Sequence, residues 1–166
     1  MKKKTLASWI CFLLLVCSCD NSQYLFRDNT AIEKEVWHAN NQIPFRFMVT
    51  DTQEIYKIGF NLRYTNIYPM QNIYIFLHTV FPNGMKAHDT IDIDLFSPEG
   101  KPLGKGVETI ELLNYFSWVQ FPVTGQYTMS LEQAMRTDSL PGMVSVGLYI
   151  AKPKKTANND KQEKNK

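Results

Sequence analysis

Residues 56–64 read YKIGFNLRY, and this stretch decides the fold class because apolar and polar positions alternate along it without a break. Every second residue from Tyr56 to Tyr64 is aliphatic or aromatic, and the four residues between them are Lys57, Gly59, Asn61 and Arg63. A period of two is typical of a β-strand, whose successive side chains point to opposite faces of the sheet. The stretch therefore predicts a strand with one buried and one outward face.

Similar patterns recur along the chain. We expect further strands over 43–49, 73–81, 88–96, 107–113, 118–123, 127–131 and 144–150. Turn signals such as Pro82-Asn83-Gly84 separate them. The 73–81 stretch has apolar residues on both faces of the predicted strand, which predicts a central strand covered on both sides. Residues 131–136 favour one helical turn. About eight or nine short strands with regular turns indicate an all-β fold, a single-domain antiparallel β-sandwich of jelly-roll-like or immunoglobulin-like type.

The N-terminus has the layout of an export signal. Three lysines precede the apolar stretch 6–16, which is too short to span a bilayer. The residues before Cys19 resemble a bacterial lipobox, in which the signal is cut between Ser18 and Cys19 and the sulfur carries a diacylglycerol. Cys19 is then the only cysteine of the mature chain, which leaves no disulfide. The alternative is an ordinary signal peptide that leaves a free thiol.

These patterns divide the chain into four parts. We predict a lipoprotein signal peptide over 1–18 and a lipid-anchored tether over 19–32 that ends in a short strand. The β-sandwich domain follows over 33–151, and a Lys/Asn-rich disordered tail over 152–166.

The charge distribution excludes a nucleic-acid binder that works through bulk charge. Residues 19–151 contain nine basic and 14 acidic residues, a net charge of −5. The tail over 152–166 contains six lysines and two acids, a net charge of +4. The predicted sandwich therefore has no excess of positive charge for a phosphate backbone.

The residues do not assemble into a recognisable catalytic or metal-binding motif. His38, His78 and His88 are far apart in sequence, and we interpret His78 as a buried, hydrogen-bonded imidazole. Asp92 and Asp94 fit a solvated strand face better than a calcium loop. Neither a Gly-x-Ser-x-Gly elbow nor a complete phosphate-binding loop is present. We therefore predict no enzymatic activity, no metal and no cofactor.

Aromatic residues are the feature that a binding module would use. The candidates for a sugar-stacking platform or a protein contact are Trp37, Tyr68, Tyr74, Tyr115 and Trp118. Arg63 projects from the polar face of the strand predicted over 56–64. From these we select Arg63, Tyr68 and Trp118 as a candidate interaction surface.

The order of several residues resembles the gliding-motility lipoprotein H (GldH) family of the Bacteroidetes. The matching residues are Trp37, Phe45, Phe47, Asp51, Tyr56, Arg63, Tyr68-Pro69, Asn72, Pro82, Gly84, Asp89-Thr90, Gly100, Leu103-Gly104, Gly106, Phe121, Gly125-Gln126-Tyr127, Gln133-Ala134-Met135-Arg136 and Val146-Gly147. The tail after residue 151 departs from the family pattern.

The resemblance implies an envelope lipoprotein without known enzymatic activity, associated with gliding motility and its linked type IX secretion. It carries over one functional position, Cys19, whose acyl chains would hold the protein to a membrane, expected to be the outer membrane. Its partners would be other envelope or gliding-machinery proteins. The alternative that the aromatic residues favour is a glycan-binding β-sandwich lipoprotein.

Overall fold

The computed structural model describes residues 23–152. One four-stranded sheet, sheet A, contains in order β1 (Tyr24–Ala31), β10 (Met143–Ala151), β4 (Ile55–Tyr64) and β7 (Ile110–Gln120). The other, sheet C, contains β3 (Ile43–Val49), β8 (Gly125–Gln133), β5 (Asn72–Val80) and β6 (Lys86–Asp94). A short 3-10 turn (Glu33–Glu35) leads into β2 (Val36–His38), which pairs with β9 (Ser139–Pro141) to form sheet B.

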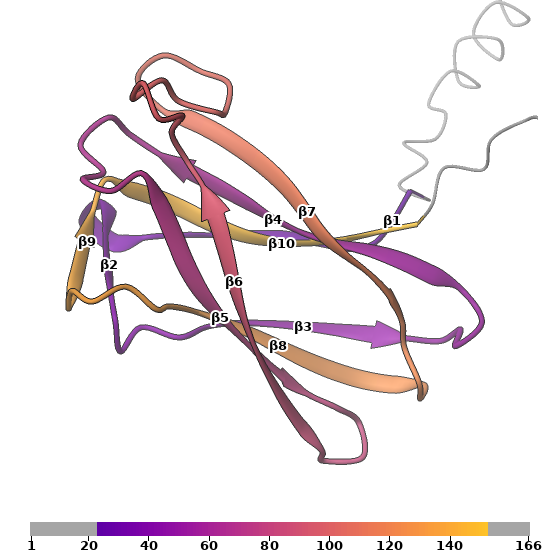
Figure 1. Cartoon of the computed structure of the whole chain (residues 1–166). Helices are drawn as coiled ribbons and strands as arrows, with labels where there is room; N and C mark the ends of the chain where they lie inside the picture. Colours follow the sequence, from indigo (N-terminus) through magenta and orange to yellow (C-terminus); the bar gives the residue numbers. More distant parts are fainter. Residues whose placement is uncertain (1–22, 153–166) are drawn as a thin grey trace, which may run out of the picture.

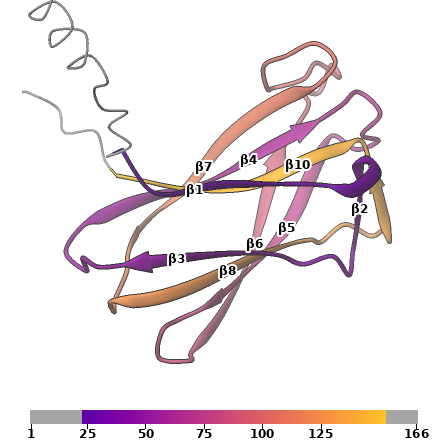
Figure 2. The same cartoon turned by 180° about the vertical axis from the view of Figure 1, so that it is seen from behind.

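Sheets A and C lie over one another as two layers (Figures 1 and 2). Every strand pair in them is antiparallel. The predicted all-β antiparallel sandwich is therefore confirmed. β3 pairs only with β8, so Pro44 lies in an edge strand, where its missing backbone N–H breaks no central ladder.

The core lies between the two layers. The alternation that begins at Tyr56 is confirmed, because its five apolar side chains, from Tyr56 to Tyr64, are all buried. On the facing sheet, Phe47 stacks on Tyr127 with ring centroids 5.8 Å apart. Phe121, directly after β7, meets Tyr127 edge-on at 4.9 Å. Each large apolar side chain buried in this way contributes about 1.5–3 kcal/mol relative to an exposed one.

Three local predictions are wrong. β5 is not covered on both sides, because the sandwich has two layers and one face of sheet C is outward. The predicted strands 107–113 and 118–123 are one continuous strand, β7. The helical turn expected over 131–136 does not form, because β8 continues to Gln133 and pairs with Ile75 of β5.

The N-terminal boundary also changes. β1 lies within 19–32, the range predicted as a tether, and pairs with β10 along most of its length. The sandwich therefore includes residues from Tyr24 onward. The predicted signal peptide (1–18), Cys19 and residues 153–166 of the predicted tail lie outside the described residues.

Candidate functional site

The outer face of sheet A brings together aromatic and basic side chains from all four strands. Register pairing places Arg27 of β1 beside Tyr149 of β10, Tyr149 beside Gly59 of β4, and Gly59 beside Tyr115 of β7. A neighbouring row contains Tyr24, Ala151, Lys57 and Trp118 in the same strand order. We call six of these residues the Trp118 cluster: Tyr24, Arg27, Lys57, Tyr115, Trp118 and Tyr149.

Cation–π contacts connect the members of the Trp118 cluster. The Arg27 guanidinium carbon lies 5.0 Å from the Tyr149 ring centroid and 5.6 Å from that of Tyr24. Lys57 Nζ lies 4.7 Å from the Tyr115 ring centroid and 5.4 Å from that of Trp118. Each such contact at an exposed site contributes about 0.5–1 kcal/mol. Trp118 is nevertheless 59% exposed, so its indole is largely in contact with solvent.

Two β-bulges make this arrangement possible. The register shifts between Tyr24 and Phe26 of β1, and again in β7, where Tyr115 pairs with Gly59 but Ser117 pairs with Ile58. In a regular strand, residues three positions apart face opposite sides. The bulges instead let Tyr24 and Arg27 share the outer face with Tyr115 and Trp118.

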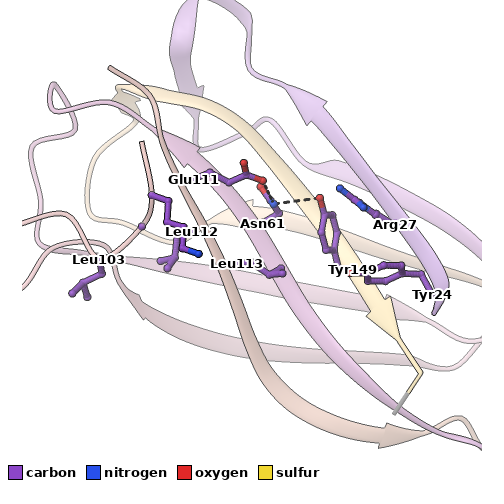
Figure 3. Close-up of a pocket in the computed structure, with 10 residues that line it drawn as sticks. Tyr24, Arg27, Asn61, Leu103, Glu111, Leu112, Leu113 and Tyr149 are labelled. Carbon is purple, nitrogen blue, oxygen red and sulfur yellow. Dashed lines mark hydrogen bonds between the residues drawn. The ribbon is translucent and has the colours of Figure 1, made fainter. Parts of the chain in front are cut away.

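A cavity of about 440 Å³ adjoins the Trp118 cluster on the same face (Figure 3). Its wall includes Asn61 of β4, whose Nδ2 donates to Glu111 Oε1 at 2.6 Å and to the Tyr149 hydroxyl at 3.2 Å. Asn29 Nδ2 donates to the same hydroxyl at 3.0 Å. Asn61 is 2% exposed, and its Oδ1 has no hydrogen-bond partner among the described residues. The cavity wall is therefore held by a polar network that leaves one acceptor unused.

The surroundings also shift two pKa values in the cluster. The neighbouring Tyr149 side chain raises the pKa of Arg27, and Tyr24 adds to the effect. Burial raises the pKa of Tyr115 to about 12. Both groups therefore keep their ordinary charge states at neutral pH, Arg27 positive and Tyr115 neutral.

The outer face of sheet C carries a different surface. Tyr74, Phe76 and Val80 project outward from β5, each at least one-third exposed, and we call these three residues the β5 strip. Between them, His78 Nδ1 lies 2.7 Å from His88 Nδ1, and His78 Nε2 lies 2.9 Å from Glu132 Oε2. The interpretation of His78 as buried is therefore corrected. It is partly exposed because it faces outward from sheet C, although its ring nitrogens do have partners.

The predicted interaction surface does not form as one patch. Arg63 and Trp118 both lie on the outer face of sheet A, but Arg63 lies six positions along β4 from Lys57, the neighbour of Trp118. Tyr68 is only 4% exposed, and its hydroxyl donates to the Asn72 carbonyl at 2.8 Å, so its place in a surface is corrected. Burial also raises its pKa above the ordinary range.

The remaining candidates from the sequence are also divided between buried and exposed positions. Trp37 is fully buried, with Nε1 donating to the Asn41 carbonyl at 2.9 Å, so it cannot stack on a sugar. Asp92 and Asp94 are both exposed on β6, as predicted. The glycan alternative therefore rests on the Trp118 cluster, whose members Tyr24, Arg27, Lys57 and Tyr149 were not singled out as candidates from the sequence.

Metal-binding clusters and membrane-spanning helices are both missing from the part of the chain that the structure describes. No group of three or more His, Cys, Asp or Glu side chains within residues 23–152 is arranged to hold a metal ion. Over the same range, no helix has the length and apolar character needed to cross a membrane.

Comparisons with known proteins agree with one another. A family model described as "GldH lipoprotein" matches residues 24–150. A relative from Christiangramia forsetii, described as "Gliding motility lipoprotein GldH homolog", is 29% identical over 149 residues, or 84% of this chain and 90% of the relative. "Gliding motility lipoprotein GldH" of Flavobacterium johnsoniae is 26% identical over 144 residues, or 82% and 89%. The class defined by these matches is that of lipoproteins involved in gliding motility.

The family model also identifies the particular family within that class. Because the family model covers more than half of the sequence, the chain belongs to the GldH lipoprotein family. The resemblance found from the sequence is thereby confirmed.

Solved structures give a weaker likeness. Dimeric latent PorU from Porphyromonas gingivalis aligns with a TM-score of 0.36 and 11% identity, over 78% of this chain and 13% of that one. A structure of infectious bursal disease virus Gx strain aligns with a TM-score of 0.29 and 12% identity, over 82% and 31%. Both TM-scores are too low to identify a common fold.

Proposed function

We propose that the chain is a lipoprotein of the bacterial cell envelope, anchored through acylated Cys19, that acts as a non-enzymatic interaction component of the gliding machinery and its linked type IX secretion. The family match over residues 24–150 carries the proposal, since it spans the sandwich from the start of β1 almost to the end of β10. Cys19 lies five residues before β1, and no cysteine follows it in the sequence.

The anchor has a simple physical basis. Each buried methylene group contributes about 0.8 kcal/mol to membrane binding, and two or more acyl chains give durable attachment. A protein confined to the outer membrane meets other envelope proteins at a raised effective concentration, so that a weak contact is enough for assembly.

The β5 strip is the surface that we assign to the protein partner. Interface cores are enriched in aromatic residues, and Tyr74 and Phe76 expose their rings side by side on one strand. The partly exposed His78–Glu132 pair lies beside them and adds a polar rim to this surface.

Metabolic labelling with palmitate tests the anchor. We expect label in the wild-type chain and in Cys11→Ser, whose substitution lies within the signal stretch, but none in Cys19→Ser. Density-gradient separation of the two membranes should place the labelled protein in the outer-membrane fraction. Equal labelling or equally firm attachment of Cys19→Ser would contradict the proposal.

Site-specific crosslinking in native envelopes tests the partner surface. A photoreactive amino acid at Phe76 should give a defined crosslinked protein, identified by mass spectrometry as an envelope component. The matched control is Ile67, an exposed apolar residue outside the β5 strip, and we expect no such product there. Identical product patterns at both positions would refute a specific interface on β5.

A further inference from the structure

The two ends of the described chain lie at the same end of sheet A. Tyr24 at the start of β1 pairs with Ala151 at the end of β10, and Figure 1 shows the chain entering and leaving the sandwich at this point. Cys19 precedes Tyr24 by five residues. A fully extended chain spans at most about 3.3–3.6 Å per residue, so an acyl chain on Cys19 keeps Tyr24 within about 18 Å of the anchor.

The same row of sheet A contains Lys57 and Trp118. Strands lie about 4.8 Å apart, so that Trp118, three strands from Tyr24, lies about 14 Å across the sheet. That is within the reach of the anchor. We propose that the Trp118 cluster lies against the membrane and inserts the exposed Trp118 indole, with the partly exposed Tyr24 and Tyr115 rings beside it, among the lipid headgroups; this inference rests on the proposed anchoring through Cys19.

The chemistry of the cluster fits the membrane–water interface. Trp and Tyr are enriched there because each combines an apolar ring with a polar atom. Trp118 is the exposed tryptophan of the described residues, and Ile55, on the same outer face beyond Lys57, is half exposed. An apolar surface of this kind at the anchored end of the protein is covered when the face lies on lipid.

The charges favour contact through the face of sheet A. Arg27 and Lys57 lie within the cluster, and the six lysines of residues 152–166 follow directly after β10 in the sequence. Each Lys or Arg close to an anionic leaflet contributes about 1 kcal/mol. The loop before β4 instead carries Asp51 and Glu54, which an anionic surface repels. The face is therefore a better contact than the loop at its edge.

This orientation leaves the other side of the protein free. The β5 strip belongs to sheet C, the opposite layer of the sandwich (Figures 1 and 2). Its exposed residues alternate with the buried Ile73, Ile75 and Leu77, so they point away from sheet A. A membrane contact on sheet A and a protein contact on sheet C therefore do not compete for the same residues.

Tryptophan fluorescence of the full-length acylated protein tests the proposal. After cleavage before Cys19 the protein retains two tryptophans, Trp118 and the fully buried Trp37, which serves as an internal reference. In vesicles of phosphatidylethanolamine and phosphatidylglycerol, we expect a blue shift and strong quenching by lipids brominated near the headgroup. Trp118→Phe should remove most of that quenching. Acrylamide quenching of Trp118 is compared between the vesicle-anchored protein and Cys19→Ser measured without detergent. Equally strong quenching in the two samples would overturn the proposal.

A charge-reversal pair tests which sheet faces the lipid. Lys57→Glu should reduce bromolipid quenching of Trp118 at least twofold, whereas Lys86→Glu, with the same charge change on the far sheet, should leave it unchanged. Equal effects of the two variants would refute the orientation. A shift of Trp118 emission caused by the soluble polysaccharide fraction of the same cells, without vesicles, would instead make the cluster a sugar platform and overturn the proposal. Loss of anchoring itself is read separately, from vesicle flotation of the wild-type protein.

Discussion

Gly59 is the position where one added methyl group would most directly disturb the Trp118 cluster. A Cβ atom built there would lie 2.6 Å from Tyr115 Cδ1 and 2.8 Å from the Asn114 carbonyl oxygen. The ring can rotate away, but the carbonyl belongs to the backbone of β7 and cannot move without disturbing its pairing with β4. Overpacking of this kind typically costs about 1–3 kcal/mol.

The stabilisation gained by removing a flexible glycine is smaller than this cost. Replacing glycine by alanine within a strand gains about 0.5–1 kcal/mol, because glycine loses more conformational freedom on folding. We therefore expect Gly59→Ala to lower the free energy of unfolding by about 0.5–2 kcal/mol. The measurement is equilibrium urea unfolding followed by the fluorescence of the buried Trp37.

A double-mutant cycle identifies the source of the loss. If Tyr115 is the group displaced, Gly59→Ala combined with Tyr115→Ala should be destabilised by less than the sum of the two single changes, by about 0.5–1 kcal/mol. A Gly59→Ala variant more stable than the wild type would refute the close approach of β7 over this residue. Strict additivity would place the clash on the backbone carbonyl alone.

Three further predictions concern the core, the cavity wall and pH. Tyr127→Phe should cost about 0.5–1.5 kcal/mol in urea unfolding, because it loses the hydroxyl bond to the Val123 carbonyl at 2.9 Å, and Tyr127→Ala about 3–5 kcal/mol. Asn61→Asp should destabilise by about 1–3 kcal/mol at neutral pH, because it places a carboxylate where an amide donates to Glu111 at 2.6 Å; recovery at acidic pH checks this. Tyr115 should titrate near pH 12 by ultraviolet absorbance. Because its folded-state pKa is raised, the stability it contributes should be complete below pH 10, decline as pH rises to 12, and be absent from Tyr115→Phe.

The buried faces of several strands could be predicted from the sequence, because alternation of apolar and polar residues is a local pattern. In β4 the alternation from Tyr56 onward reports directly which side chains are buried. The same rule fails for β5, where Tyr74 and Phe76 are apolar but face outward. A single strand does not reveal whether its second face meets another layer, so apolar residues on both sides are read as a central covered strand. The predicted start of the sandwich at residue 33 is too late for a related reason, since β1 is held by pairing with β10, more than 100 residues away.

The Trp118 cluster could not be predicted because its signal depends on bulges. Simple alternation assigns Tyr115 and Trp118 to opposite faces of a strand, since they are three positions apart. The extra residue in β7 is Phe116, whose ring packs on Phe60 of β4 at 4.6 Å between centroids. An aromatic contact with the core therefore fixes the bulge, and the bulge in turn fixes the outward direction of both rings.

The two bulges together explain how a sheet of ordinary residues acquires a specialised face at one end. In β7 the shift brings Trp118 to Lys57, and in β1 the shift at Tyr24 brings that ring to Arg27. Bulges are local in the strand that carries them, so most of sheet A keeps regular pairing on either side. A protein that must keep one face packed on a core while placing aromatic and basic groups together on the other can do so with one extra residue in each of two strands. Both bulges lie toward the end of sheet A where β1 begins, which is the placement that the proposed membrane contact predicts.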